Sequence, residues 1–567
     1  MTDLEGNFDV IILGTGLVES IAAAALSKAG VKVAHLDQNP YYGGDEASLT
    51  LDELARWADV RSESSENSGK SSSYLTAQRS KFTSISRSGV IPDHSRHYSI
   101  SLSPTLIPSV GPLISSLIAS GVSRYGGYRL LERVGIYSSN SGLQNVPGSK
   151  EDVFKSTLSL IEKRRLMRFL VFASGDFEVS KELQGHEQTA FPEFLASQFS
   201  LTQEMVNAIV YALAFCSSTT DATLPAMTRL RSYLRSSGRY GASPFLVGHY
   251  GGLGEIAQGF CRVSAVNGGV YILDKKAEKI TAPLPASGEK FVVELDDFPE
   301  PLTADVLIAA PDQLPTGLCP PAQTASLSII ARCTVVIDKP IPFPPLLSSG
   351  EGPSEDEAES APAAEEGDDT GGLTSNSTTQ PEASVEAPPI DTSVIVFPPG
   401  SVKGGSSTRV AQAFTTGAGT LSAPQGKWKC LFRYVVYLSS PVADGEDPEQ
   451  LLKPYLDTIL SLTDVSEPLF KVVYTQHVSP SSALIPTSTQ SSILVSPALP
   501  PHLAEISDSA SSVAERLFFG VVDTLKAKNP EAWTTETPNG ESSSGDRFVE
   551  LKVPMWPLME GPGEEEE

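Results

Sequence analysis

The hydrophobic pattern at the start of the chain predicts a strand, a helix and a second strand in quick succession. Phe8 to Leu13 is a short, mostly apolar run of strand length. Ile21 to Leu26 is apolar and rich in alanine, and it predicts a helix that ends near Gly30. Lys32 to Leu36 predicts the second strand. This order is typical of a dinucleotide-binding unit.

The turn after the first strand carries an incomplete form of the dinucleotide-binding motif. Gly14 and Gly16 match the first two glycines of G-x-G-x-x-G, and Asp37 lies where an acid that binds a ribose is expected. Glu19 replaces the third glycine, and its carboxylate would occupy the phosphate position and repel phosphate. An acid in a first helical turn also suits the helix dipole, so both interpretations remain open. We predict a nucleotide-binding fold without a dinucleotide cofactor.

Helical periodicity replaces the strand pattern in the second quarter of the chain. Leu201 to Cys216 and Asp221 to Ser236 repeat apolar side chains at helical spacing. Strand-like runs and glycine-rich turns return after Gly238, and Ala504 to Lys528 contains a C-terminal helical pattern. The predicted fold is α/β. A flavoprotein-like (Rossmann-type) multi-sheet domain over residues 1–148 and 239–567 is interrupted by a small α-helical domain over residues 149–238.

Three segments are polar and poor in apolar residues, as is typical of solvent-exposed or disordered chain. Residues 61–88 are rich in serine, residues 348–389 are rich in serine, proline and acid, and residues 557–567 contain GPGEEEE. We expect a disordered insert, an acidic loop and an acidic tail at these places.

Charge and cysteine usage narrow the class of protein. A net charge of −26 disfavours direct binding to nucleic acid or to an anionic membrane surface. The five cysteines and seven histidines are dispersed, which predicts free thiols and no metal site. No run reaches the roughly 18 apolar residues that a membrane span needs, and no signal peptide is visible. We therefore expect a cytoplasmic protein.

Two motifs suggest recognition rather than catalysis. Tyr41 and Tyr42 follow the second strand in NPYYGG, where they either cover a loop or form an exposed patch. Glu255 and Arg262 are seven residues apart, so they share one helix face, which either faces solvent or binds a partner. The sequence contains no GxSxG or HExxH motif and no catalytic Cys/His pair in a recognisable context.

In order along the chain, these motifs resemble the superfamily of Rab GDP-dissociation inhibitors and Rab escort proteins. The resemblance runs from Phe8 to about Leu273 and rests on FDVIILGTGLVES, HLD with NPYYGG, EKRRLMRFLVF, GRYGASPFL, GLGEIAQGFCR and AVNGGVYIL. It implies a protein without catalysis that binds GDP-bound Rab GTPases and shields their geranylgeranyl lipids. The inserts, the chain length and the Glu19-Ser20 and Phe260-Cys261-Arg262 sequences favour the escort branch, which presents new Rabs to the Rab geranylgeranyltransferase heterodimer.

The resemblance also implies roles for single residues and leaves alternatives open. It implies a lipid groove among the helices between Gly148 and Gly238, and only transient membrane contact. The alternatives are the inhibitor branch, a flavin oxidoreductase and a scaffolding protein that acts through its inserts. The implied Rab-binding residues are Tyr42, Glu255 and Arg262, together with Arg239, Ser243 and Phe245 in a mobile loop, and the candidates for transferase contact are Phe169 and Phe172.

Overall fold

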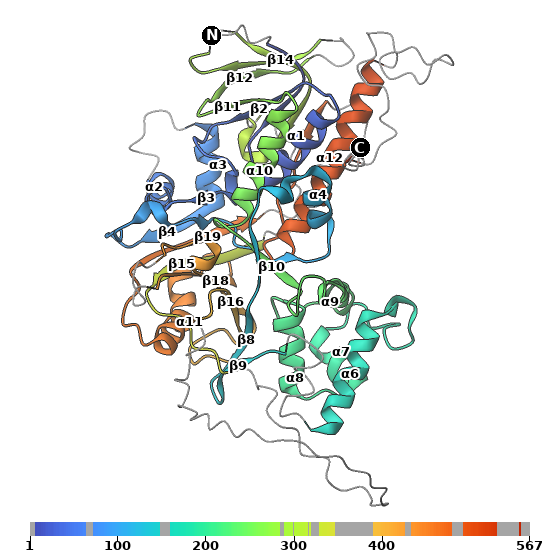
Figure 1. The fold of residues 1–567 in the computed structure, drawn as a ribbon, viewed down its shortest axis with the longest axis vertical. Coiled ribbons are helices and arrows are strands. Elements are labelled where there is room, and N and C mark those ends of the chain that lie inside the picture. The colour runs from blue at the N-terminus through green and yellow to red at the C-terminus, as the bar shows by residue number, and fades with distance from the viewer. Residues whose placement is uncertain are drawn as a thin grey trace, which may run out of the picture.

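A computed structural model shows an α/β body from which a lobe of helices projects (Figure 1). Two large sheets form the body, and the lobe contains α6 to α9. The structure describes residues 6–63, 72–147, 159–283, 289–298, 300–315, 317–318, 328–345, 389–425, 432–478, 492–529 and 555–556.

The first sheet contains the predicted dinucleotide-binding unit. Its strand order is β11-β2-β1-β14-β13-β12, and β20 pairs with β14. The strands from β11 to β14 and β20 run parallel, whereas β13 and β12 are antiparallel. The strands are β1 (Asn7–Leu13), β2 (Val33–Asp37), β11 (Val270–Leu273), β12 (Ala277–Thr281), β13 (Phe291–Leu295), β14 (Leu302–Ala309) and β20 (Ile493–Val495).

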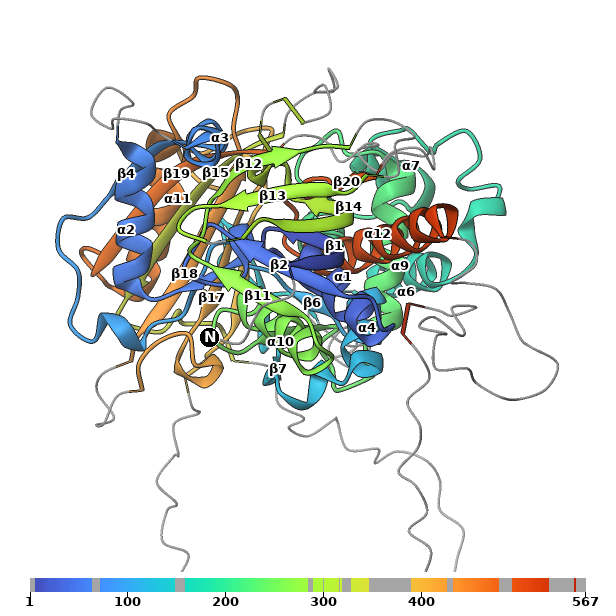
Figure 2. The same ribbon diagram turned by 90° about the horizontal axis from the view of Figure 1, so that it is seen from above.

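Three helices cover one face of this sheet: α1 (Leu17–Lys28), α10 (Leu253–Val266) and α12 (Ile506–Lys528) (Figure 2). The run Ala22 to Ala25 in α1 is fully buried, and its small side chains let α10 and α12 pack closely on both sides. Glycine turns join β1 to α1 and bring the N-terminus of this helix to the carboxyl ends of β1 and β2. The C-terminal helix predicted from the sequence is α12.

The second sheet has the order β4-β19-β15-β18-β17-β16-β8-β9 and is antiparallel except for the pair β16–β8. Helix α11 (Pro448–Thr463) packs against it through one hydrophobic cluster, and α2 (Leu51–Ser62) contributes to another. The strands are β4 (Phe82–Arg87), β8 (Arg133–Ser138), β9 (Gly142–Asn145), β15 (Ser328–Ile337), β16 (Ser393–Phe397), β17 (Ala411–Thr416), β18 (Tyr434–Pro441) and β19 (Phe470–Val478).

Short elements connect the two sheets and carry residues of the candidate site. One small sheet has the order β6-β10-β7, and another pairs β3 with β5. These elements are β3 (Ser48–Leu49), β5 (Ile100–Ser101), β6 (Ile107–Pro108), β7 (Tyr128–Leu130), β10 (Phe245–Gly248), α3 (Ser73–Lys81), α4 (Pro112–Ser120), and the 3-10 turns η1 (Gly44–Glu46) and η3 (Val122–Arg124).

The lobe contains α6 (Leu160–Ser174), α7 (Phe191–Phe199), α8 (Gln203–Asn207), the π-helical turn η5 (Ala208–Leu213) and α9 (Thr223–Ser236). A capping box of Ser159 and Glu162 starts α6. Aromatic side chains of α6 and α7 fill the core of the lobe, which is continuous with the core of the second sheet. The predicted α/β class with several sheets is therefore confirmed, and the helical segment lies where the periodicity indicates. A lipid-binding role of this lobe stays a prediction.

The structure corrects the expected disorder of residues 61–88. Helix α2 continues to Ser62, and residues 72–88 supply α3 and the edge strand β4. Tyr74 and Gln78 of α3 are buried, so tertiary packing orders this serine-rich segment in spite of its composition. Residues 64–71, nearly all of the predicted acidic loop and all of the tail at 557–567 lie outside the described residues. Among the described ranges, no helix is long and apolar enough to cross a membrane.

Candidate functional site

The N-terminus of α1, where a bound dinucleotide would place its phosphates, is occupied by the protein's own carboxyl groups. The Leu17 N–H donates to Glu46 Oε2 at 3.1 Å, and Glu46 comes from η1, directly after NPYYGG. A Cβ atom at Gly16 would lie 2.6 Å from Glu19 Oε2 and 3.1 Å from Glu46 Oε2. Glycine at this position therefore makes room for two internal carboxyl groups.

Asp37, expected to meet a ribose, is instead used to hold two turns together. Its Oδ2 accepts the Thr15 N–H at 2.7 Å and the Thr15 hydroxyl at 2.6 Å. Its Oδ1 accepts the backbone N–H of Asn39 at 2.8 Å and the side-chain amide of Asn39 at 2.9 Å. The side chain is buried. Asp37 therefore links the turn after β1 to the turn after β2, and both of its oxygens have internal donors.

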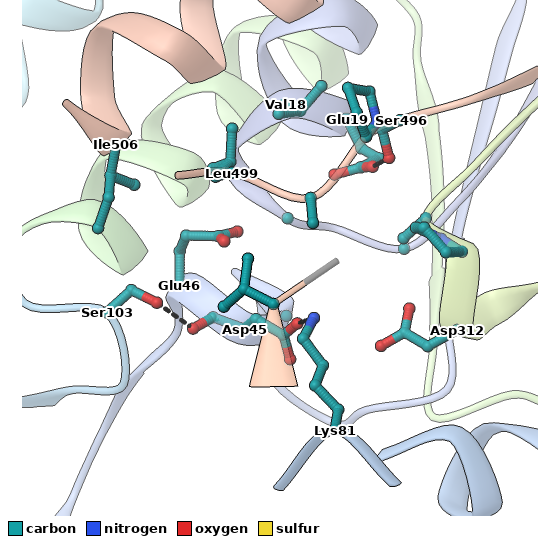
Figure 3. Close-up of a pocket in the computed structure, with 18 of the residues that line it drawn as sticks. Val18, Glu19, Asp45, Glu46, Lys81, Ser103, Asp312, Ser496, Leu499 and Ile506 are labelled. Atoms are coloured by element: carbon teal, nitrogen blue, oxygen red, sulfur yellow. Dashed lines mark hydrogen bonds and ion pairs between the residues drawn. The ribbon is translucent and has the colours of Figure 1, made fainter. Parts of the chain in front are cut away.

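A cavity of about 90 Å³ remains beside this helix end, and we call it the acidic cavity because four carboxyl side chains are part of its lining (Figure 3). They are Glu19, Asp45, Glu46 and Asp312. Ser496 donates a hydrogen bond to Glu19, and Lys81 pairs with Asp45. Burial raises the pKa of Glu19 to about 7, and burial together with the charge of Asp45 raises the pKa of Glu46 to about 8. The raised pKa favours the protonated form of the Glu19 carboxyl, so the expected repulsion of phosphate by a charged Glu19 stays a prediction. Among the described residues, no acid, histidine or cysteine cluster has the geometry of a metal site.

Helix α10 carries the two charges predicted to bind a partner. Glu255 in its first turn is half-buried, and this burial raises the pKa of the carboxyl group. Arg262, two turns later, is exposed, and its Cζ lies 4.5 Å from the centre of the Tyr125 ring. The start of α10 contacts η1 and β3, the elements that follow NPYYGG. Tyr42 of that motif is partly exposed and packs edge-on against Tyr271, with ring centres 6.0 Å apart.

The predicted mobile loop divides into an exposed part and a buried part. Arg239 is exposed, and its guanidinium lies 5.4 Å from the ring centre of Tyr240. The Ser243 hydroxyl accepts the backbone N–H of Phe245 at 3.3 Å. Phe245 itself lies in β10, is 3% exposed and packs against Tyr233 at 5.0 Å. The ring of Phe245 therefore belongs to the core in this conformation, and its contact with a partner stays a prediction.

The two aromatic candidates for transferase contact also point inward. Phe169 is fully buried, with its ring centre 5.1 Å from that of Phe199, so contact with a transferase would require this part of the lobe to open, and its role stays a prediction. Phe172 is half-buried and lies 5.0 Å from the same ring. The exposed apolar side chains of α6 are Leu160, Ile161 and Val171. Helical spacing from an inward Phe169 could have indicated Val171, which lies two residues further along the helix.

The sequence prediction missed two parts of the site. Asp312 and Lys81 line the acidic cavity but come from segments far from α1 in sequence, and no local pattern links them to it. Tyr125 lies outside the quoted motifs, although the residue is 54% exposed and the Arg262 guanidinium lies over its ring. The predicted residues Gly14, Gly16 and Glu19 do meet at one cavity.

The sequence matches one family model and is similar to several known proteins. A family model described as GDP dissociation inhibitor matches residues 4–345. Three similar proteins are named Rab proteins geranylgeranyltransferase component A. The Saccharomyces cerevisiae protein is 31% identical over 422 residues, which cover 74% of this chain and 60% of the relative. The Candida albicans protein is 35% identical over 279 residues, which cover 47% of this chain and 41% of the relative. The Drosophila melanogaster protein is 34% identical over 328 residues, which cover 56% of this chain and 62% of the relative. The chain thus spans less than two thirds of each relative's length.

Solved structures share the fold. The Rab GDI of Plasmodium falciparum aligns with a TM-score of 0.59 at 20% identity, over 92% of this chain and 98% of that one. An oxidoreductase of Methanosarcina mazei aligns with a TM-score of 0.51 at 14% identity, over 90% and 99%. Because the family model covers more than half of its residues, this chain belongs to the GDP dissociation inhibitor family.

Proposed function

We propose that this protein is an escort for Rab GTPases: it binds newly made, GDP-bound Rab, presents it to Rab geranylgeranyltransferase and carries the prenylated Rab to membranes. The observation that carries the proposal is helix α10, which bears Glu255 and Arg262 and contacts η1 and β3, the elements that follow Tyr42 in the chain. Family membership and the names of three relatives support a Rab as the partner. We call Tyr42, Glu255 and Arg262 the proposed Rab platform.

The proposed role involves no bond chemistry and no cofactor. Glu46 accepts an N–H of α1, and Asp37 is saturated by Thr15 and Asn39, so both positions that would hold a dinucleotide are used internally. An escort acts by holding Rab and transferase together, which turns a weak encounter into a reaction within one complex.

The helical lobe is the proposed shield for the geranylgeranyl chains. Burial of each methylene contributes roughly 0.8 kcal/mol, so a lipid tail strongly favours an apolar groove over water. The aromatic core around Phe169, Phe194 and Phe199 is closely packed, so such a groove requires the lobe to open. Membrane contact is then transient, and the protein acts in the cytoplasm.

The second candidate is a Rab GDP-dissociation inhibitor, which recycles prenylated Rab. The family description favours it, since the model that matches residues 4–345 is named for that activity. Both candidates use the same platform and differ in the partner that joins the complex.

A reconstitution separates the two candidates. Purified Rab loaded with GDP is mixed with Rab geranylgeranyltransferase and lipid donor, with and without the full chain, and lipid transfer is measured. An escort is expected to be required for transfer, whereas transfer by other prenyltransferases to short C-terminal peptides is unaffected. Transfer at full rate without the chain, together with extraction of prenylated Rab from membranes by the chain, would favour the inhibitor.

Substitution of the platform tests the binding site itself. Glu255→Ala and Arg262→Ala are each expected to weaken binding of GDP-loaded Rab by about 2–5 kcal/mol, the usual cost of removing one partner of a buried interfacial charge pair. Tyr42→Ala is expected to weaken binding through lost contact area. The matched controls are Glu515→Ala and Arg516→Ala, which remove exposed charges on α12. Unchanged affinity in both platform charge variants would mean that the platform is misplaced.

A further inference from the structure

The guanidinium of Arg262 is held by an aromatic ring. Within the described residues it has no ion pair or hydrogen bond, and its directional contact is the face of Tyr125, with Cζ 4.5 Å from the ring centre. A cation over the face of a tyrosine at this distance is attracted by the ring quadrupole. The ring therefore favours one orientation of a long side chain that would otherwise sample many rotamers.

Tyr125 is fixed relative to α10 by close backbone packing. It directly follows η3 and donates its backbone N–H to the carbonyl of Val122 at 2.9 Å. A Cβ atom at Gly259 of α10 would lie 2.8 Å from the Cγ1 atom of Val122, so η3 packs directly on this helix three residues before Arg262. The ring and the guanidinium are thus carried by two elements in tight contact.

The chain after Tyr125 is restrained as well. A Cβ atom at Gly127 would lie 2.3 Å from Nδ1 of His249, and the backbone N–H of His249 donates to the carbonyl of Gly127 at 2.9 Å. His249 belongs to the connection between β10 and α10. The turn that presents Tyr125 is therefore held on both sides by segments that also position α10.

We propose that Tyr125 is a positioning residue of the Rab platform: its ring preorganises the Arg262 guanidinium for an acidic or carbonyl acceptor on GDP-bound Rab. This inference rests on the proposed function and adds a residue to its site. An arginine that is already oriented loses less conformational freedom on binding, which improves affinity without a new contact between the two proteins. Tyr125 is 54% exposed, so replacement of its side chain is expected to leave the core intact.

A double-mutant cycle in the full chain tests the proposal. Tyr125→Phe keeps the aromatic face and Tyr125→Leu removes it, and each is made in the parent and in an Arg262→Met background that keeps the arginine stem. The measurement is the Kd for GDP-loaded Rab, with the melting temperature as a check on folding. Tyr125→Phe is expected to bind within about twofold of the parent, and Tyr125→Leu roughly threefold to thirtyfold more weakly. In the Arg262→Met background, Tyr125→Leu is expected to have no further effect.

Three results would overturn the positioning role. The first is parent-like affinity of Tyr125→Leu. The second is an equal loss in both backgrounds, which would mean that the ring touches the Rab itself. The third is a loss in Tyr125→Phe as large as in Tyr125→Leu, which would assign the effect to the hydroxyl. If the parent does not bind Rab, or if Arg262→Met and Glu255→Ala both leave the Kd unchanged, the platform fails together with the inference; if Arg262→Met alone leaves the Kd unchanged, the positioning role of Tyr125 fails while the rest of the platform can stand. If Arg262→Met weakens binding and Tyr125→Leu does not, the inference alone fails.

Discussion

Glu19→Gln is expected to stabilise the folded protein at alkaline pH and to have little effect at acidic pH. Glu19 is buried at the N-terminal end of α1, where burial raises its pKa from 4.5 to about 7. In the unfolded chain the carboxyl ionises near 4.5, while the folded protein keeps the proton until about pH 7. Between these values the unfolded state has already lost its proton, so stability falls as pH rises.

The size of the effect follows from this difference in pKa. Each unit of pKa difference between two states is worth about 1.4 kcal/mol, so a rise from 4.5 to about 7 corresponds to about 3 kcal/mol lost above neutral pH. The amide of Gln cannot ionise, and its oxygen can still accept the hydrogen bond from Ser496. The substitution also removes a neighbouring charge that raises the pKa of Glu46.

The assay is urea unfolding followed by tryptophan fluorescence at about pH 5 and about pH 9. Trp57 is a suitable reporter, since it is buried and packs 5.1 Å from the ring centre of Phe82. The free energy of unfolding of Glu19→Gln is compared with that of the parent at each pH. The difference between the two proteins is expected to grow by about 3 kcal/mol, in favour of the variant, from about pH 5 to about pH 9. Glu515→Gln, an exposed acid on α12, serves as the control. If the difference in free energy of unfolding is the same at both pH values, the reasoning is refuted, because Glu19 would then have the same pKa in the folded and the unfolded protein.

Two other predictions concern the cofactor content of the purified protein and the packing of the lobe. The purified protein is expected to carry no stoichiometric flavin or nicotinamide, because Asp37 and Glu46 already use the ribose and phosphate positions internally; mass spectrometry after denaturation would detect either molecule. Phe169→Ala is expected to lower the free energy of unfolding by about 3–5 kcal/mol, since the ring is fully buried. Phe172→Ala is expected to lower the free energy of unfolding by less than Phe169→Ala, because Phe172 is half-buried. Equal losses for the two variants in denaturant unfolding would contradict the packing described.

The sequence by itself determined the elements whose pattern is local. The apolar run of β1, the alanine-rich α1 and the short β2 follow from residues within a few positions of one another, and so do the helical periods of α9 and α12. The replacement of the third motif glycine by Glu19 is equally local, and it indicated that the phosphate position is altered. Six ordered motifs identified the family, which the family model confirms.

Only the tertiary structure decided which side chains meet. Glu46, Lys81 and Asp312 come from three separate segments and line one cavity with the start of α1. Burial, with a smaller contribution from the charge of Asp312, raises the pKa of Glu19. Periodicity shows that an element has an apolar face but not what covers that face, so Phe169 and Phe245 could not be assigned to the core from their motifs. Tyr125 reaches Arg262 because η3 packs against α10, a contact between segments more than a hundred residues apart that no local pattern encodes.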